Sequence, residues 1–380
     1  MWLALRPREQ QAALPEPLFP PTETHPSLSF DGKRVAFESA RSSATGEGLS
    51  AIGEGQASTD IVLIDRPTAS VRRLTAERGA NRNPCLAGDG ETFVYENSDG
   101  PTRQSDIYLG DFSSAQSDRI EIPWRKSGKG NCFAPQISND GSRLGFLTYR
   151  PRHDTRHWVS SVALSRPGDL TAVEVPDNWR SAMAEGRIAL SPNGKRAVWE
   201  QRTVSIDRKL AIRLISLTEG GAPLTIYRGG GEPTLTDTQC VFVALDSKGI
   251  YQLVIHDFTT GQQRFLTHGN DDSLEPSISV DGNFIAFTSY ATDLVANDTN
   301  RMSDIFVYDL QGEEITCLTA TGDGMSSNPA ISGDGTTVAF ASQATNLGPE
   351  KVPAGQVYIW ERGWQSCEAL PFQATSTASE

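Results

Sequence analysis

The sequence predicts an all-β protein that is built from one repeated four-stranded unit. Three observations predict it: a phrase of proline, a D-G turn and an apolar strand recurs along the chain, alternating apolar and polar residues flank each turn, and no segment has a clear helical pattern. Radial repetition of such units leaves only short, protected sheet edges. We therefore predict a seven-bladed β-propeller of four-stranded antiparallel blades.

The recurring phrase predicts the first two strands of each unit, which a tight turn joins as a hairpin. Asp31-Gly32 and Asp281-Gly282 are typical turn pairs, because glycine tolerates a positive φ and aspartate can bond its own backbone. The proline lies at the entrance of the first strand, where its missing N–H costs least. The copy EPTLTDTQCVFVAL has lost the D-G pair. The seven copies begin at His25, Asn83, Ala134, Arg187, Glu232, Glu275 and Asn328.

A third strand follows each hairpin, and a short fourth strand follows the third. TDIVLID from Thr59 and SDIFVYD from Ser303 are examples of the third strand, and VRRLTAE and QQRFLTHG are examples of the fourth. Every copy carries all its strands, which favours seven blades over six or eight. The predicted organisation is a Pro-rich lead-in segment over 1–24, the propeller over 25–370 and a C-terminal tail over 371–380.

The stretch EPSISVDGNFIAFTSYATDLVANDTNRMSDIFVYDL, which begins at Glu275, resembles the bacterial WD40-like (PD40) β-propeller repeat family, typified by the TolB-like propeller. The P-x-x-S-x-D-G phrase and the D-I-F/Y strand carry the resemblance, which covers nearly the whole chain. It implies a propeller in the periplasm or cell envelope, although no targeting signal is visible in the chain. TolB-like proteins carry a further N-terminal α/β domain, for which the sequence before the first repeat leaves no room.

Composition excludes several classes of function. The formal net charge of −13 disfavours a nucleic-acid partner, because such binding depends on neutralising phosphates. No run approaches the ~20 apolar residues of a transmembrane segment. The five cysteines form no CxxC or other zinc spacing, and we interpret them as buried small residues.

The sequence also lacks the motifs of several kinds of enzyme. There is no G-x-S-x-G nucleophile elbow, no S-x-D-x-G-x-x-W turn of sialidase-type propellers and no glycine-rich phosphate loop before a helix. We therefore predict a chain that is not an enzyme, with a glycosidase or lyase as the alternative.

A polar cluster in the sixth repeat suits a hard cation such as Ca²⁺, because its carboxylate and amide oxygens are closely spaced. The alternative is an Asx-rich loop whose side chains bond its own backbone. The last aspartate of the cluster recurs as Asp60 and Asp106 before other apolar strands, which favours a structural role. No other cofactor is expected. The candidate ligands are Asn297, Asp298, Asn300 and Asp304.

A ligand is expected on the face opposite the D-G turns. There the connections between second and third strands emerge, and they differ in length and composition over 41–58, 97–105, 150–156, 290–303 and 343–355. Variable loops on a rigid scaffold commonly carry binding, and arginine and aromatic residues are frequent in binding hot spots. The candidate contacts are Tyr149, Arg150, Arg152, His153, Arg156, Tyr290 and Arg301.

These observations predict a non-catalytic binding module or scaffold for a protein or peptide partner. One alternative is a carbohydrate-binding or carbohydrate-active propeller, which predicts a central channel lined by paired carboxylates with arginine or exposed tryptophan. Another is a structural subunit of a larger complex, which predicts an exposed apolar patch.

Overall fold

The computed structural model describes residues 23–40, 59–74, 80–99, 104–120, 131–149, 161–166, 169–173, 182–203, 210–217, 224–363 and 366–370. Every regular element in these ranges is a β-strand, as the sequence predicted. In the same ranges there is no helix with the length and hydropathy of a membrane span. The predicted lead-in segment and tail lie outside the described residues, except that the first strand already begins at Glu23.

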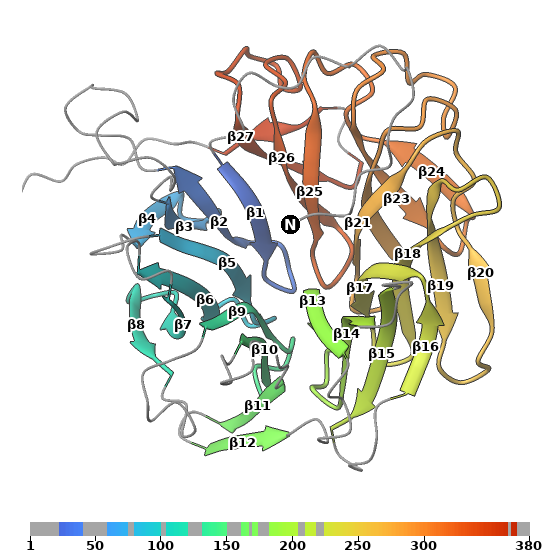
Figure 1. The fold of residues 1–380 in the computed structure, drawn as a ribbon. Helices are drawn as coiled ribbons and strands as arrows, with labels where there is room; N and C mark the ends of the chain where they lie inside the picture. Colours follow the sequence, from blue (N-terminus) through green and yellow to red (C-terminus); the bar gives the residue numbers. More distant parts are fainter. Residues whose placement is uncertain are drawn as a thin grey trace, which may run out of the picture.

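Six antiparallel four-stranded blades make up most of the described structure, each with its strands in sequence order (Figure 1). The first two blades are β1 (Glu23–Leu28), β2 (Arg34–Ala40), β3 (Thr59–Asp65), β4 (Ser70–Leu74) and β5 (Ala80–Leu86), β6 (Thr92–Asp99), β7 (Gln104–Asp111), β8 (Gln116–Arg119). The next two are β13 (Ala182–Leu190), β14 (Arg196–Thr203), β15 (Leu210–Ser216), β16 (Leu224–Arg228) and β17 (Gly230–Leu235), β18 (Gln239–Leu245), β19 (Tyr251–Asp257), β20 (Gln263–Phe265). The last two are β21 (Ser273–Ile278), β22 (Phe284–Ser289), β23 (Asp304–Asp309), β24 (Glu314–Cys317) and β25 (Ser326–Ile331), β26 (Thr337–Ser342), β27 (Gln356–Glu361), β28 (Glu368–Ala369).

The prediction of seven four-stranded blades was wrong, because the third repeat forms two separate two-stranded sheets. One sheet pairs β9 (Asn131–Ile137) with β10 (Leu144–Tyr149), and the other pairs β11 (Ser161–Arg166) with β12 (Asp169–Val173). Serines interrupt the apolar run of β11, SVALSR, whereas β3 carries the continuous run IVLI. This run therefore has fewer of the β-branched residues that favour strands than the corresponding run of β3.

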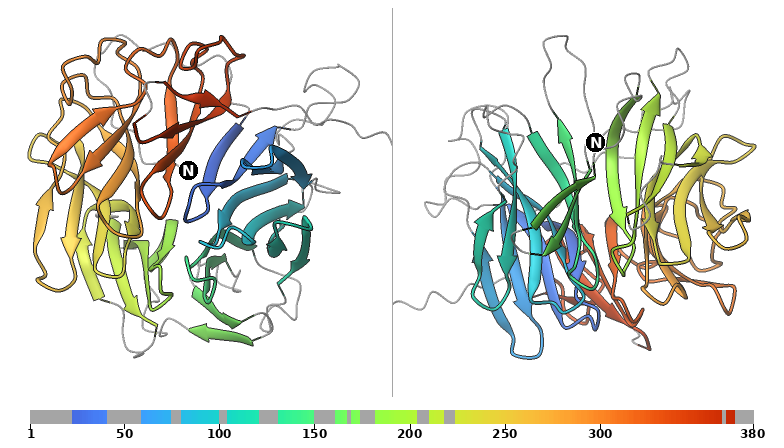
Figure 2. Two further views of the ribbon diagram at one scale, coloured as in Figure 1. Left: turned by 180° about the vertical axis from the view of Figure 1, so that it is seen from behind. Right: turned by 90° about the horizontal axis from the view of Figure 1, so that it is seen from below.

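The first strands of successive repeats lie side by side around the middle of the molecule. β1 contacts both β5 and β25, so the ring closes, and Figure 2 shows the same arrangement from behind and from below. Each four-stranded blade comes from one continuous stretch of chain, and the first and last blades therefore meet without exchanging a strand.

The core lies between neighbouring blades, which explains the continuous apolar runs of the second and third strands. Val35 and Phe37 of the first blade pack with Ala339 and Val357 of the last blade in one buried cluster. Five consecutive residues of β2 are buried, because each blade is covered on both faces.

The D-G turns have the predicted conformation, with φ of 67° at Gly32 and 68° at Gly335. The serine two residues before the aspartate adds a bond within the turn: Ser29 Oγ donates to Asp31 Oδ1 at 2.8 Å and accepts from the Arg34 N–H at 3.0 Å. The turns are also linked around the molecule by backbone hydrogen bonds. These run from Phe30 N to Gly88 O, Gly88 N to Asn139 O, Asp140 N to Pro192 O, Val280 N to Gly333 O and Asp334 N to Phe30 O.

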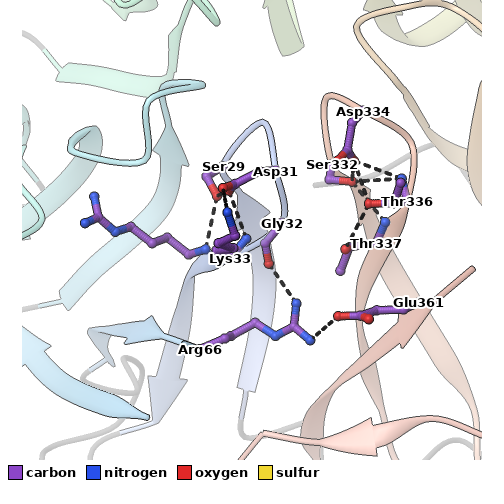
Figure 3. Close-up of polar contacts among 11 residues, drawn as sticks. Ser29, Asp31, Gly32, Lys33, Arg66, Ser332, Asp334, Thr336, Thr337 and Glu361 are labelled. Atoms are coloured by element: carbon purple, nitrogen blue, oxygen red, sulfur yellow. Dashed lines mark hydrogen bonds and ion pairs between the residues drawn. The ribbon is translucent and has the colours of Figure 1, made fainter. Parts of the chain in front are cut away.

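Side chains close the seam between the first and last blades (Figure 3). Arg66, after β3, forms an ion pair with Glu361 at the end of β27, with 2.5 Å between Nη2 and Oε1. The same guanidinium donates to the Gly32 carbonyl at 2.9 Å. Asp334 N donates to Phe30 O at 3.0 Å, so both backbone and side chains cross the seam.

Candidate functional site

The first strand of each four-stranded blade, other than β13, carries a non-glycine residue in the left-handed region directly before its proline. The strand pairing shifts register at the same point, as between Thr24 and Ser27. Left-handed backbone costs a non-glycine residue about 1 to 2 kcal/mol, so neighbouring contacts have to hold it. The residues are His25 (φ 51°), Asn83 (51°), Glu232 (52°), Glu275 (56°) and Asn328 (54°), and Ala134 (51°) occupies the same place in β9.

Glutamates supply those contacts, because a carboxylate of one repeat accepts the N–H of the left-handed residue in the next. For Glu96 the corresponding donor is the Ala134 N–H, which favours the ionised carboxylate. We call Glu38, Glu96, Glu200, Glu232 and Glu275 the inner glutamates. The other bonds are Asn83 N to Glu38 Oε1 (2.7 Å), Glu232 N to Glu200 Oε1 (2.6 Å), Glu275 N to Glu232 Oε2 (2.6 Å) and Asn328 N to Glu275 Oε2 (2.7 Å).

The inner glutamates lie beside the ring of first strands, nearer the end at which the chain enters each blade than the D-G turns. Glu38, for instance, pairs with Thr24 near the start of β1, whereas the turn of that hairpin is at Asp31 and Gly32. The carboxylates therefore lie towards the face from which the variable connections emerge.

Two arginines act on the inner glutamates: Arg82 lowers the pKa of Glu96, and Arg187 on β13 lies near Glu275. Its Nη2 lies 4.0 Å from Glu275 Oε1, and the two side chains are 44% and 22% exposed. Burial lowers the pKa of Arg187, but the charges of Glu232, Glu275 and Glu200 outweigh burial and raise it.

Burial raises the pKa values of Glu96, Glu200 and Glu232. The pKa of Glu200 rises to about 7, with a further increase from the charge of Glu232, while the Glu232 N–H and Arg187 oppose the shift. Burial also raises the pKa of Glu232, which Arg187 lowers and Glu275 raises. At neutral pH the inner glutamates are therefore partly protonated and partly ionised.

The structure describes only some of the predicted binding residues. Tyr290 follows β22, and its N–H donates to Asp272 O at 2.9 Å. Arg301 is exposed, with φ of 60°, shortly before β23. Tyr149 ends β10, and its side chain lies outside the described residues, as do Arg150, Arg152, His153 and Arg156. The basic loop that these residues form in the sequence thus stays a prediction.

Three of the four predicted metal ligands come together. Asn300 Nδ2 donates to Asp304 Oδ1 at 3.1 Å, and Asp298 lies close enough to raise the pKa of Asp304 beyond the increase that burial causes. Asn297 is exposed.

Sequence reasoning missed the inner glutamates, although two signals mark them. Glu232 and Glu275 each precede the proline of a repeat, and Glu38, Glu96 and Glu200 each follow the apolar run of a second strand. Both signals need the repeats to be aligned with one another before they are visible.

Neither His25 nor the thiols of Cys85, Cys240, Cys317 and Cys367 is an activated nucleophile. His25 Nδ1 lies 3.1 Å from both Thr24 Oγ1 and Glu38 Oε1, so one ring nitrogen faces both groups and the imidazole cannot relay a proton between them. Burial raises the pKa of Cys85 to about 11 and that of Cys367 to about 12, and it raises the pKa of Cys240 and Cys317 as well. These four thiols are therefore protonated at neutral pH.

The comparisons with known proteins support the fold alone. No family model matches the chain, and no curated protein sequence matches it. The β-propeller domain of the Trilobed protease from Pyrococcus furiosus, which has an open velcro topology, is similar in structure, with 12% identity over 92% of this chain and 98% of that chain and a TM-score of 0.64. A puromycin-hydrolyzing peptidase of Mycobacterium tuberculosis gives 13% identity, 92% and 53% coverage and a TM-score of 0.62.

An oligogalacturonate lyase in complex with manganese is also similar, with 13% identity over 73% of each chain and a TM-score of 0.52. The present chain spans about half of the M. tuberculosis peptidase. Fold and comparisons together define a β-propeller.

Proposed function

We propose that this chain is a non-catalytic binding propeller that accepts a cationic segment of a protein or peptide partner at the end of its axis where the inner glutamates lie. The observation that carries the proposal is the charge balance there. Among the described residues, the basic side chains that act on the five inner glutamates are Arg187, Arg82 and His25, so carboxylates outnumber cations. The formal net charge of −13 adds long-range attraction for a cationic partner.

Burial of the carboxylates strengthens the preference for a cationic segment. Because the pKa of Glu200 is about 7, this group is partly protonated at neutral pH. A lysine, arginine or terminal amine beside it would favour the ionised form, so binding is expected to release protons. Affinity for a cationic segment is therefore expected to rise with pH between about 6 and 8.

The repeat phrase supports a place in the PD40-type group and, through that resemblance, in the bacterial periplasm or cell envelope. Both assignments are part of the proposal. Large exposed hydrophobic side chains in the described ranges are Phe30, Leu224 and Leu245, which belong to three different blades. This scatter favours a binding module over a structural subunit with a contiguous apolar patch.

A carbohydrate-active propeller is the second candidate, because Glu200, Glu232 and Arg187 place carboxyls with raised pKa beside a guanidinium. The excess of carboxylates would repel an anionic sugar, so a neutral oligosaccharide is the substrate class that this candidate requires.

Calorimetric titration with short synthetic peptides tests the proposal. A lysine- and arginine-rich peptide is expected to bind, and the double variant Glu232→Gln/Glu275→Gln is expected to bind it about tenfold more weakly, or about 1.4 kcal/mol. The control Glu314→Gln/Glu368→Gln removes two charges from the exposed outer strands β24 and β28 and should bind as the wild type does.

Equal binding of a glutamate-rich peptide, or no binding of either peptide by folded protein, would overturn the proposal. Binding of neutral oligosaccharides, together with turnover that Glu200→Gln abolishes, would favour the second candidate instead.

A further inference from the structure

An aspartate at the start of the third strand recurs in three blades, and in two of them the fourth strand supplies its counter-ion. Asp60 Oδ2 lies 3.0 Å from Arg73 Nη1 in the first blade. Asp106 Oδ2 lies 3.2 Å from Arg119 Nε in the second blade. In both blades the arginine follows the aspartate by 13 residues. The blade plan therefore pairs this aspartate with a cation on the neighbouring strand.

The equivalent aspartate on β23, Asp304, has no such cation. The residue 13 positions later on β24 is Cys317, whose side chain carries no positive charge. Asp304 is fully buried, with 0% exposure. Among the described residues no lysine, arginine or histidine forms an ion pair with it.

A second buried carboxylate raises the free-energy cost of burying this negative charge without a cation. Asp298 is 7% exposed and lies close enough to Asp304 to act on it electrostatically. One oxygen of each, Asp298 Oδ1 and Asp304 Oδ2, is buried without a hydrogen-bond partner. Buried acceptors are almost always satisfied, and two neighbouring carboxylates repel each other unless a cation or a proton lies between them.

The other oxygen of Asp304 is already satisfied, which leaves Oδ2 for a ligand. Thr319 Oγ1 donates to Asp304 Oδ1 at 2.5 Å and Asn300 Nδ2 donates to the same oxygen at 3.1 Å. Asn300 Nδ2 also lies 3.4 Å from the carbonyl oxygens of Thr319 and Gly322. The carboxylate is thus held in one orientation, with oxygen atoms on the surrounding loop.

We propose that Asp298 and Asp304 bind a divalent cation, Ca²⁺, through these two unpaired oxygens. Ca²⁺ takes six to eight oxygen ligands, so water and nearby carbonyl oxygens complete the shell. Both proposed ligand atoms are carboxylate oxygens, whereas Zn²⁺ prefers thiolate and imidazole. No group of three histidine, cysteine, aspartate or glutamate side chains meets in the described part of the chain, so we expect weak binding, with a Kd between about 10⁻⁴ and 10⁻³ M.

Thermal unfolding and equilibrium dialysis test the site on the whole chain. After EDTA treatment, millimolar Ca²⁺ is expected to raise the melting temperature by about 2 to 5 °C and to bind in one equivalent. Asp298→Asn and Asp304→Asn should each abolish both effects. Asp106→Asn is the matched control at the same place in the second blade, and it should leave the response to Ca²⁺ unchanged.

A further variant keeps the test independent of whether the aspartate variants fold. Cys317→Arg places on β24 the cation that the first two blades carry. It is expected to raise the melting temperature of the EDTA-treated protein and to remove the response to Ca²⁺. The proposal would be overturned by an unchanged melting temperature of the wild type in millimolar Ca²⁺, by a response that persists in Cys317→Arg, or by stabilisation with Zn²⁺ but not Ca²⁺.

Discussion

Glu200 shows how contacts between repeats change the chemistry of a side chain. In the sequence it is one glutamate after an apolar run, whereas in the structure its carboxylate is 7% exposed and accepts the N–H of Glu232. Burial raises its pKa from the usual 4.5 to about 7. The position of the fifth repeat relative to the fourth decides this shift, and a linear motif does not record that position.

The raised pKa makes stability depend on pH. Between about pH 4.5 and 7 the folded protein keeps a proton on Glu200 that the unfolded chain has released, so the free energy of unfolding falls as the pH rises through this window. Glu200→Gln keeps an oxygen for the Glu232 N–H and removes the charge. We expect the variant to match the wild type near pH 4 and to be more stable at pH 8 by roughly 1 to 3 kcal/mol, as measured by urea unfolding.

Glu314→Gln on the exposed edge of β24 is the control, and its stability should follow the wild type at both pH values. A Glu200→Gln variant that also follows the wild type from pH 4 to pH 8 would show that Glu200 is ionised as easily in the fold as in the unfolded chain.

At the residue scale, local motifs were predictable and contacts between repeats were not. The S-x-D-G phrase predicts its own turn, because every bond within it joins residues at most five positions apart, as between Ser29 and Arg34. The partner of Glu38 lies 45 positions away, at Asn83. Such a pair appears only when two repeats are placed side by side.

At the element scale, the first strand of each repeat combines regular pairing with one strained residue. Ala134 on β9 has φ of 51°, and its N–H is held by Glu96. Sequence reasoning placed the proline at this strand but did not consider the conformation of the residue before it, where proline ordinarily favours extended backbone. The carboxylate of the preceding repeat offsets the strain.

Ala134→Gly is expected to stabilise the protein, because glycine adopts a positive φ without the cost that a Cβ brings. The loss of one partly buried methyl group reduces the gain, so we expect about 0.5 to 1 kcal/mol in urea unfolding.

The matched control is Ala330→Gly on β25. This alanine follows its proline and is not among the residues with positive φ, so glycine there should destabilise by about 0.5 to 1 kcal/mol. If both variants lost stability equally, the left-handed conformation of Ala134 would be in error.

The third repeat shows the limit of prediction at this scale. Its hairpin phrase was read correctly as β9 and β10, but β11 pairs with β12 alone. The repeat phrase predicts the hairpin of the first two strands, because it covers only those strands. The ladder between the second and third strands also depends on the apolar run of the third strand, which lies outside the phrase.

At the scale of the whole molecule, the seam between the first and last blades closes the ring. Arg66 and Glu361 are 18% and 34% exposed at this seam, so their ion pair is more shielded than most surface pairs. A double-mutant cycle with Arg66→Ala and Glu361→Ala is expected to give a coupling energy of about 1 kcal/mol in chemical unfolding. The bond from Arg66 to Gly32 is lost in both Arg66 variants and cancels in the cycle.

The control cycle uses Lys33 and Asp31, which pair within the first blade with 63% and 46% exposure. It should give no measurable coupling. A seam pair that behaves like this exposed pair would mean that the backbone bond from Asp334 to Phe30 and the buried side chains close the ring without help from charge.

The absence of strand exchange has a consequence for synthesis. Each four-stranded blade is encoded by one uninterrupted stretch, so a blade can complete its ladder soon after its own last strand leaves the ribosome. Only the seam has to wait for the final blade. Until then β1 and β2 expose the apolar face that Ala339 and Val357 later cover, and the nascent chain is most exposed to aggregation during that interval.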